Sequence, residues 1–215
     1  MNNKNIYVLS DKKVKNTNSL PMFEIEYIKQ KIDLENYDAL LFTSKNAIKA
    51  LVSMDESWKK IPAYVIAPET AKVLEHHGGN LAFVGEKSHG NDFAKEVEDK
   101  LAGKKVLYFC GKKVVSNVVD ILNENNVQCD RLVVYETVCK SYENATALPK
   151  GSVIVFSSPS TINCFFKNIS WDESYKAVSI GKTTAKYFPS HITPIVADHT
   201  TLNSCVDKAF ELLNT

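Results

Sequence analysis

Short runs of consecutive apolar residues alternate along the chain with stretches in which apolar residues recur every three or four positions. Unbroken apolar runs are typical of strands buried on both faces of a sheet, and the stretches between them have the spacing of amphipathic helices. Strands followed by helices predict an α/β fold with parallel sheets covered by helices. The predicted strands are residues 6–10, 39–44, 63–67, 105–111, 132–137, 152–158 and 177–181. The clearest helices are residues 46–52, 70–77, 91–101 and 116–126.

Two segments of this pattern occur twice at one spacing. Phe42–Ile48 (FTSKNAI) aligns with Phe156–Ile162 (FSSPSTI), and 156 − 42 = 114. Ala63–Lys72 (AYVIAPETAK) aligns with Ala177–Lys186 (AVSIGKTTAK), and 177 − 63 is again 114. A shared offset without a gap indicates two similar structural units.

A third, weaker match gives the order of these units. Ile6–Val14 aligns with Val106–Val114 at an offset of 100 (106 − 6). In the middle of the chain, Val106–Val114 follows the first copies of the two repeated segments, whereas its own match, Ile6–Val14, lies at the start of the chain before all of them. One α/β domain inserted into another explains this order, whereas a single large α/β domain with repeated strand–helix units is the alternative. The insertion predicts a discontinuous domain of residues 1–23 and 140–215 and an inserted domain of residues 24–139.

Composition and charge narrow the possible partners. The chain has 26 Lys and Arg against 25 Asp and Glu, so it lacks the basic excess of nucleic-acid-binding proteins. The first apolar run, Ile6–Leu9, is too short for a signal-peptide core or a membrane span, which predicts a cytoplasmic protein without membrane contact. The five cysteines form no CxxC pair and are expected to be free thiols, several of them in buried packing.

Several well-known site motifs are absent or incomplete. Gly181-Lys182-Thr183 resembles the end of a phosphate loop, but Lys176 stands where that loop needs its first glycine. The sequence contains neither a GxGxxG dinucleotide fingerprint nor a GxSxG nucleophile elbow. His76 and His77 precede Gly78, which is a helix C-terminus signal rather than a metal-ligand spacing. No metal or cofactor is expected.

The remaining candidate chemistry lies in hydroxyl side chains at strand-to-helix turns. Serine and threonine are good N-caps, which alone could explain these positions. In doubly wound sheets, however, such turns lie at the carboxyl edge, where ligands bind and helix N-termini favour anions. Some of these side chains are therefore expected to bind a polyanionic ligand. The candidate binding residues are the hydroxyl residues Thr43, Ser44, Thr70, Ser157, Ser158, Ser160, Thr183 and Thr184, together with the adjacent Lys182.

Tyr135 differs from these residues because it is a phenol late in an apolar run, just before the second expected crossing between domains. From the pattern alone it is either an ordinary strand-end tyrosine or a residue whose hydroxyl emerges at a domain cleft. Clefts between domains are preferred places for small-molecule sites.

The order of these motifs resembles the uroporphyrinogen-III synthase family over almost the whole chain. The chain departs from the usual family pattern at Lys45, Ala67 and Phe93. The matching motifs are Phe42-Thr43-Ser44, VIAPETAKVL, HGNDFAKEV, Val134–Thr137 (VYET), Phe156–Ser160 (FSSPS) and Ile180–Ala185 (IGKTTA).

The resemblance implies two flavodoxin-like parallel-sheet domains joined by a two-strand linker, one of them discontinuous. It also implies a cofactor-free lyase that cyclises hydroxymethylbilane, a linear tetrapyrrole polycarboxylate, with inversion of ring D. Tyr135 would act on the leaving hydroxyl, and Thr184 would act with it at the catalytic centre. The hydroxyl turns would bind the acetate and propionate groups. The expected protein is a monomer that receives its substrate from hydroxymethylbilane synthase.

Two other functions remain open from sequence. A non-catalytic, two-lobed cytosolic protein that binds a small anion would share the same plan, although the length leaves no room for an effector domain. A flavodoxin-type electron carrier would contain a flavin and be coloured when purified.

Overall fold

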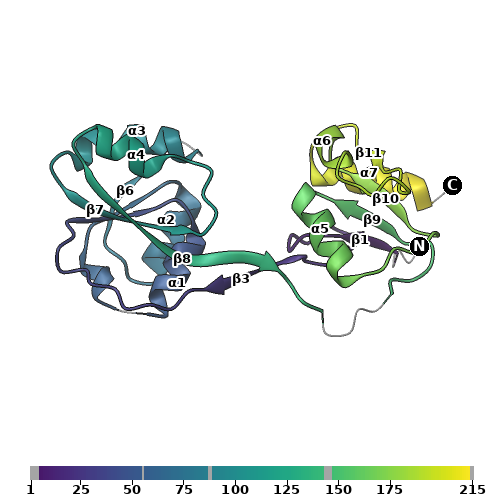
Figure 1. Ribbon diagram of the computed structural model, residues 1–215, viewed down its shortest axis with the longest axis horizontal. Helices are drawn as coiled ribbons and strands as arrows, with labels where there is room; N and C mark the ends of the chain where they lie inside the picture. The colour runs from purple at the N-terminus through teal and green to yellow at the C-terminus, as the bar shows by residue number, and fades with distance from the viewer. Residues whose placement is uncertain (1–4, 55, 87–88, 143–146, 214–215) are drawn as a thin grey trace. The chain divides into compact units, whose positions relative to one another are not determined.

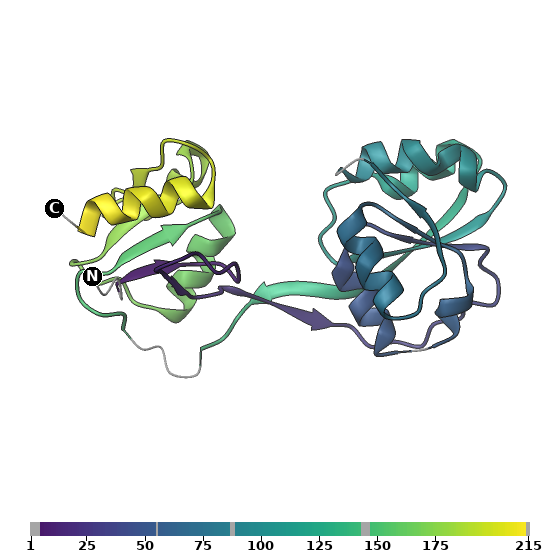
Figure 2. The same ribbon diagram turned by 180° about the vertical axis from the view of Figure 1, so that it is seen from behind.

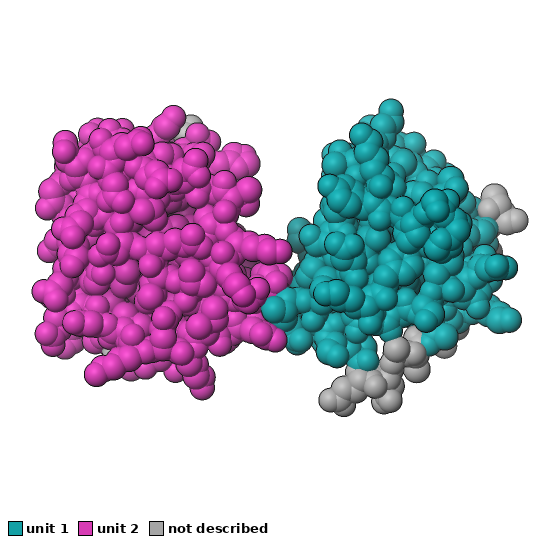
Figure 3. Space-filling view, viewed as in Figure 1, with its two compact units in different colours: residues 1–24, 138–215 teal, residues 25–137 magenta. Residues whose placement is uncertain are grey.

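The computed structural model describes residues 5–54, 56–86, 89–142 and 147–213, and the chain forms two compact units (Figure 3). Unit 1 comprises Met1–Glu24 and Val138–Thr215, and unit 2 comprises Ile25–Thr137. Among the described residues, no helix combines the length and apolar character needed to cross a membrane.

Unit 2 is built on a six-stranded sheet with the order β3-β8-β7-β4-β5-β6 (Figure 1). β4 pairs in parallel with β5 and β7, β5 pairs in parallel with β6, and β7 pairs in parallel with β8. The chain enters this unit through β3 and leaves it through β8. The strands are β3 (Phe23–Tyr27), β4 (Ala39–Phe42), β5 (Ala63–Val65), β6 (Leu81–Val84), β7 (Lys105–Gly111) and β8 (Gln128–Cys139).

Helices cover both faces of this sheet, which explains the unbroken apolar strands. In β4, Leu40 and Phe42 pack in one core with residues of α1 and α2, whereas Ala39 and Leu41 pack in a second core with residues of α3 and α4. Successive strand side chains point to opposite faces, so every position of β4 must be apolar. The helices are α1 (Lys45–Val52), α2 (Pro68–His76), α3 (Gly90–Leu101) and α4 (Val118–Glu124), with a short 3₁₀ helix η1 (Ser57–Lys60).

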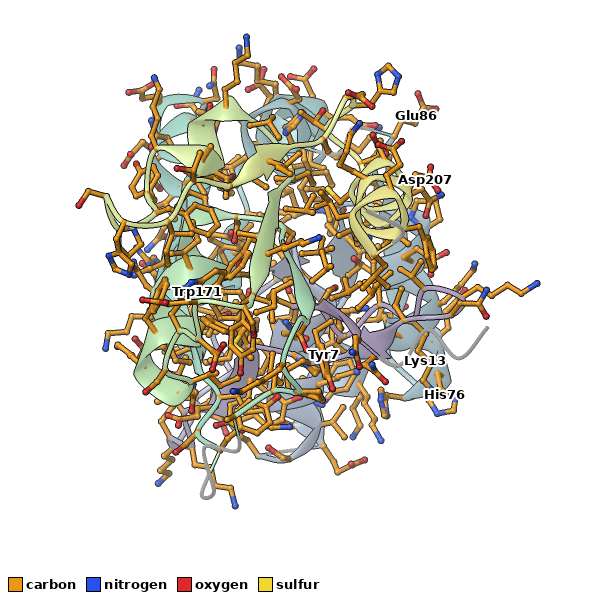
Figure 4. The ribbon with its side chains drawn as sticks, turned by 90° about the vertical axis from the view of Figure 1, so that its right-hand side faces the viewer. Tyr7, Lys13, His76, Glu86, Trp171 and Asp207 are labelled. Carbon is orange, nitrogen blue, oxygen red and sulfur yellow. A yellow bond between two sulfur atoms is a disulfide. The ribbon has the colours of Figure 1, made fainter. Side chains whose placement is uncertain are left out.

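Unit 1 has a parallel sheet with the order β11-β10-β9-β1-β2. α7 (Leu202–Leu213) covers one face, and α5 (Pro159–Asn168) covers the other with the four-residue α6 (Lys182–Ala185) beside it (Figure 2). Trp171 packs its ring against Phe165 and Tyr175 on the α5 side (Figure 4). The strands are β1 (Ile6–Val8), β2 (Asn18–Ser19), β9 (Val153–Phe156), β10 (Lys176–Ser179) and β11 (Ile195–Val196).

The repeat predicted from sequence is present in the structure. β9 begins 114 residues after β4 (153 − 39), α5 begins 114 after α1 (159 − 45), and α6 begins 114 after α2 (182 − 68). Numbered from β4, unit 2 has the strand order 3-2-1-4-5, and unit 1 has the same order when numbered from β9 through β1 and β2. In chain order, unit 1 is therefore the flavodoxin arrangement 2-1-3-4-5. The two units are circular permutations of one another.

The expectation of five free thiols is wrong. Cys139 at the end of β8 forms a disulfide with Cys164 in α5, with their Cα atoms 5.2 Å apart. Cys110, Cys129 and Cys205 are free and buried. The pairing has no sequence signal, because it depends on β8 continuing two residues past the predicted strand end at Thr137.

Candidate active site

A pocket of about 570 Å³ lies in unit 2 at the carboxyl ends of its parallel strands. Its wall contains Thr43 and Ser44 after β4, the first turn of α3, Tyr108 and Gly111 from β7, and Tyr135 from β8. In the sheet, β4 lies between β5 and β7. The next strands along the chain, β5 and β6, are added on one side of β4, and the later strands β7 and β8 are added on its other side. This reversal of strand order is where ligands bind in doubly wound sheets.

Thr43 and Tyr108 form a direct hydrogen bond at this pocket, with 2.7 Å between Thr43 Oγ1 and Tyr108 Oη. The side chain of Ser116 lies near the Tyr108 hydroxyl and also lines the pocket. Burial raises the pKa of Tyr108 above its ordinary value of 10.0, although these hydroxyl partners oppose the shift. The phenol is therefore protonated at neutral pH and can donate a hydrogen bond.

Ser44 both caps a helix and lines the pocket. Its Oγ accepts a hydrogen bond from the backbone N–H of Asn46 at 3.2 Å, so Ser44 is the N-cap of α1. The capping explanation given by the sequence is confirmed here, and it is compatible with a position in the pocket wall.

Tyr135 is half-buried and lies against Gly111 on the neighbouring strand. A Cβ atom on Gly111 would lie 2.8 Å from Cε2 and Cζ of Tyr135, so only glycine leaves the ring its present place. The backbone N–H of Lys112 donates to the carbonyl of Tyr135 at 2.9 Å. Tyr135 thus belongs to a fixed part of the pocket wall.

Arg131, the single arginine of the chain, lies on β8 and forms hydrogen bonds with residues at the end of β7. Its Nε donates to Cys110 Sγ at 3.1 Å, and its Nη2 donates to the carbonyls of Gly111 at 3.3 Å and Lys112 at 3.1 Å. These contacts fix the turn that leads from Gly111 to the pocket residue Lys113.

The first turn of α3 contributes backbone amides to the pocket wall. Residues 89–92 line the pocket, and α3 begins at Gly90. The first backbone amides of a helix have no partner within it and carry the positive end of the helix dipole. A Cβ on Gly90 would lie 2.5 Å from Ser116 Oγ, so glycine allows this turn to approach the Ser116 loop. Helix-start amides of this kind can bind a carboxylate, and the Asp92 side chain of the same turn also lines the pocket.

The predicted serines of unit 1 lie at the β9–α5 turn. Ser158 caps α5 in a reciprocal arrangement: its Oγ accepts from the Thr161 N–H at 3.3 Å, and Thr161 Oγ1 accepts from the Ser158 N–H at 3.2 Å. Ser157 is half-buried and Ser160 is exposed.

The predicted residues at the other turns differ in exposure. Lys182 and Thr183 are exposed at the start of α6, whereas Thr184 is 5% exposed and Thr70 in α2 is 6% exposed. None of these four lines the unit 2 pocket. The structure therefore gathers only Thr43, Ser44 and Tyr135 from the predicted set into that pocket.

Sequence reasoning missed the other polar residues of the pocket wall. Tyr108 was hidden in a strand-like apolar run, and Ser116 in a segment predicted as helix. The signal that could have found Tyr108 is the alternation of β7, which places it on the same face as Val106 and Cys110. Within the described ranges, His, Cys, Asp and Glu side chains form no group of three or more that could hold a metal ion.

The fold and the pocket define a class: an α/β protein of two permuted, doubly wound units with a hydroxyl-lined pocket at a sheet switch point. Residues 16–207 match the family model described as uroporphyrinogen-III synthase HemD. The chain belongs to the uroporphyrinogen-III synthase family.

Individual relatives agree with this assignment. The chain is 30% identical over 199 residues to porphyrin biosynthesis protein HemD of Ruminiclostridium josui, covering 84% of this chain and only 39% of that protein. It is 23% identical to uroporphyrinogen-III synthase of Chlorobaculum parvum, covering 71% of this chain and 70% of that protein. The crystal structure of uroporphyrinogen-III synthetase from Helicobacter pylori 26695 is similar with a TM-score of 0.71 and 29% identity, covering 97% of this chain and 99% of that one.

Proposed function

We propose that this protein is a hydro-lyase that cyclises hydroxymethylbilane to uroporphyrinogen III, inverting ring D and releasing water. Family membership supports this proposal. The observation that carries it is that Thr43 and Ser44, which follow β4, and Tyr135 of β8 line one pocket together with the first turn of α3. A phenol beside hydroxyls and helix amides suits a reaction in which a hydroxyl group leaves from a polycarboxylate.

The reaction asks little acid or base chemistry of the protein. The pyrrole nitrogen of the terminal ring pushes electrons as the hydroxyl leaves with a proton as water, and an electrophilic azafulvene remains. The substituted carbon of the far ring attacks it to give a spiro intermediate, which opens and recloses with that ring inverted. The enzyme must hold the flexible chain in the folded geometry and stabilise the departing oxygen.

Tyr135 would donate a hydrogen bond to the departing hydroxyl. Its ring has one place against Gly111, so the phenol would be oriented before the substrate arrives. A preorganised donor costs no rearrangement during the reaction and stabilises the charge that develops on oxygen.

The other residues would bind the carboxylates. Thr43 and Ser44 would do so with the amides of α3 in the unit 2 pocket, and Thr70 would support the α2 turn. In unit 1, the β9–α5 and α6 turns would hold further acid groups, through Ser157, Ser158, Ser160, Lys182 and Thr183. Thr184, being buried, would contribute through the α6 turn that it anchors and is proposed as the second catalytic position.

The protein would act in the cytoplasm as a monomer, with residues 24–139 as a domain inserted into a discontinuous domain of residues 1–23 and 140–215. It would receive hydroxymethylbilane from hydroxymethylbilane synthase and need no cofactor.

A coupled assay tests the function directly. The purified protein is mixed with porphobilinogen and hydroxymethylbilane synthase, and the products are oxidised and separated into type I and type III porphyrin. Type III product that increases with added protein is the expected result. Type I product alone, as in the assay without this protein, would contradict the proposal and favour a binding protein without catalysis.

A further inference from the structure

Three hydroxyl groups from separate segments meet at the pocket of unit 2, and we call Thr43, Tyr108 and Ser116 the hydroxyl cluster. Thr43 follows β4, Tyr108 lies within β7, and Ser116 lies between β7 and α4. Tyr108 adjoins the other two, since its hydroxyl is 2.7 Å from Thr43 Oγ1 and lies near the Ser116 side chain. All three residues line the pocket.

Strand pairing, not a flexible loop, places Tyr108 next to Thr43. Leu41 of β4 is the register partner of Tyr108 in β7. Thr43 comes two residues after Leu41 and so lies on the same side of the sheet. Tyr108 is 2% exposed, with its ring held in the core between the sheet and α3 and α4. The phenol therefore has a fixed position from which it can orient a neighbour.

The repeat shows that the hydroxyl of Tyr108 is present in unit 2 and has no counterpart in unit 1. In the alignment of Ile6–Val14 with Val106–Val114, the counterpart of Tyr108 is Val8, which has no hydroxyl. A core position of this strand is therefore filled well by an aliphatic side chain. The hydroxyl of Tyr108 is an addition that packing does not require.

The direction of the hydrogen bonds follows from what a carboxylate can do. A carboxylate only accepts, whereas a threonine hydroxyl has a single proton to donate. When Tyr108 donates to Thr43, the proton of Thr43 remains available for the pocket. Hydrogen bonds in such a chain strengthen one another. Burial keeps Tyr108 protonated, as this arrangement needs.

We propose that Tyr108 is a positioning residue whose hydroxyl orients Thr43 to donate a hydrogen bond to a carboxylate of the bound tetrapyrrole. This inference rests on the proposed function for the class of ligand, and it adds a residue that contributes to affinity through Thr43. Tyr108 acts on binding and not on the departure of the hydroxyl group at Tyr135.

A double-mutant cycle tests the coupling, with the variants Tyr108→Phe, Thr43→Val and both together. Affinity is measured by absorbance titration with uroporphyrin III, a stable octacarboxylate, and KM and kcat are measured with freshly released hydroxymethylbilane. Tyr108→Phe should raise Kd and KM about fivefold and leave kcat within about twofold. In the Thr43→Val background, Tyr108→Phe should have no further effect. Tyr64→Phe is the matched control, since Tyr64 is a buried phenol of β5 that does not line this pocket.

The outcomes separate this inference from the proposed function. Formation of type III product by the wild type decides the function, whereas the ratio of Kd values between variants decides the inference. An unchanged Kd for Tyr108→Phe, a fall in kcat alone, independent effects in the double variant, or a wild type that binds no uroporphyrin would each overturn it. If circular dichroism shows Tyr108→Phe to be unfolded, Tyr108→Met, which also lacks the hydroxyl, takes its place in the same cycle, with the same expected loss of affinity and the same overturning results.

Discussion

The ring of Tyr135 occupies the space that a side chain on Gly111 would fill. The two residues are register partners on β8 and β7, at a shift in the strand pairing between Cys110 and Gly111. A Cβ on Gly111 would lie 2.8 Å from Cζ and 3.1 Å from the hydroxyl oxygen of Tyr135. The missing side chain of one strand therefore sets the position of the phenol on the next. Gly111 should thus matter to catalysis although it has no chemistry of its own.

Gly111→Ala should lower kcat about tenfold or more, because a small displacement of a catalytic donor weakens its contact with the transition state. The measurement is kcat in the coupled assay beside the thermal unfolding of the variant. Gly103→Ala is the control for loss of stability alone: Gly103 has φ +73° with open space around it, so alanine there strains the backbone of the same unit without touching Tyr135. Equal kcat values for both variants would contradict the role given to Gly111.

Tyr135→Phe should lower kcat about 100-fold, in line with the removal of one preorganised hydrogen-bond donor. The ring and its packing against Gly111 remain, so the unfolding temperature and the Kd for uroporphyrin III should stay close to the wild type. Rates of type III formation and an absorbance titration give both values. Full turnover by the variant would remove Tyr135 from the reaction.

Thr184→Val should reduce turnover about tenfold while the protein stays folded, since valine keeps the shape of the buried side chain and removes its hydroxyl. Thr184→Ser should retain most of the activity because it keeps the hydroxyl. Circular dichroism with the coupled assay distinguishes a lost function from a lost fold. If valine and threonine at position 184 give equal rates, the hydroxyl has no part in the site.

The sequence could predict the strands β1, β4, β5, β7, β8, β9 and β10 and the helices α1–α4 because a parallel sheet with helices on both faces leaves a strong pattern. It did not predict β2, β3, β6, β11 or α7. β4 and β9 are apolar at every position. The offset of 114 residues between them is the same as the offset between the helices α1 and α5 that follow them. Ser44 and Ser158 were identified as caps because capping depends on residues close in sequence.

The parts that escaped prediction depend on contacts between distant segments. Cys139 and Cys164 pair because β8 extends into unit 1 beside α5, and no spacing rule encodes that. Tyr108 looked like a core aromatic, and only its register with Leu41 of β4 brings its hydroxyl to Thr43. Register is a property of the folded sheet, so a single sequence gives the composition of the pocket only in part.

Ser158 and Ser160 lie in one turn, but only Ser158 caps α5, so the two variants measure what the cap contributes to stability. Ser158→Ala removes the reciprocal cap of α5 and should cost about 1 kcal/mol of stability. Ser160→Ala should leave stability unchanged, because that side chain is exposed in the first turn. Chemical denaturation measures both free energies of unfolding. An equal loss in the two variants would show that the cap of Ser158 adds no stability of its own.

The cysteines give a prediction that depends on pH. Burial raises the pKa of Cys129 to about 12 and that of Cys205 to about 11, and it also raises the pKa of Cys110. The thiolate is the reactive form, so at pH 8 a thiol with a pKa of 12 is ionised to roughly one part in ten thousand, against roughly one part in ten for an ordinary cysteine with a pKa near 9.

Native protein should therefore react very slowly with a disulfide reagent such as dithionitrobenzoate at pH 8. In denaturant, the three free cysteines should react, and prior reduction should expose all five. The raised pKa values also mean that the unfolded chain loses its thiol protons first, so the contribution of these groups to stability is complete below about pH 9 and is lost as the pH rises towards 12. Five thiols in denaturant without reduction would show that Cys139 and Cys164 are not joined, and rapid reaction of the native protein at pH 8 would contradict the burial of Cys110, Cys129 and Cys205.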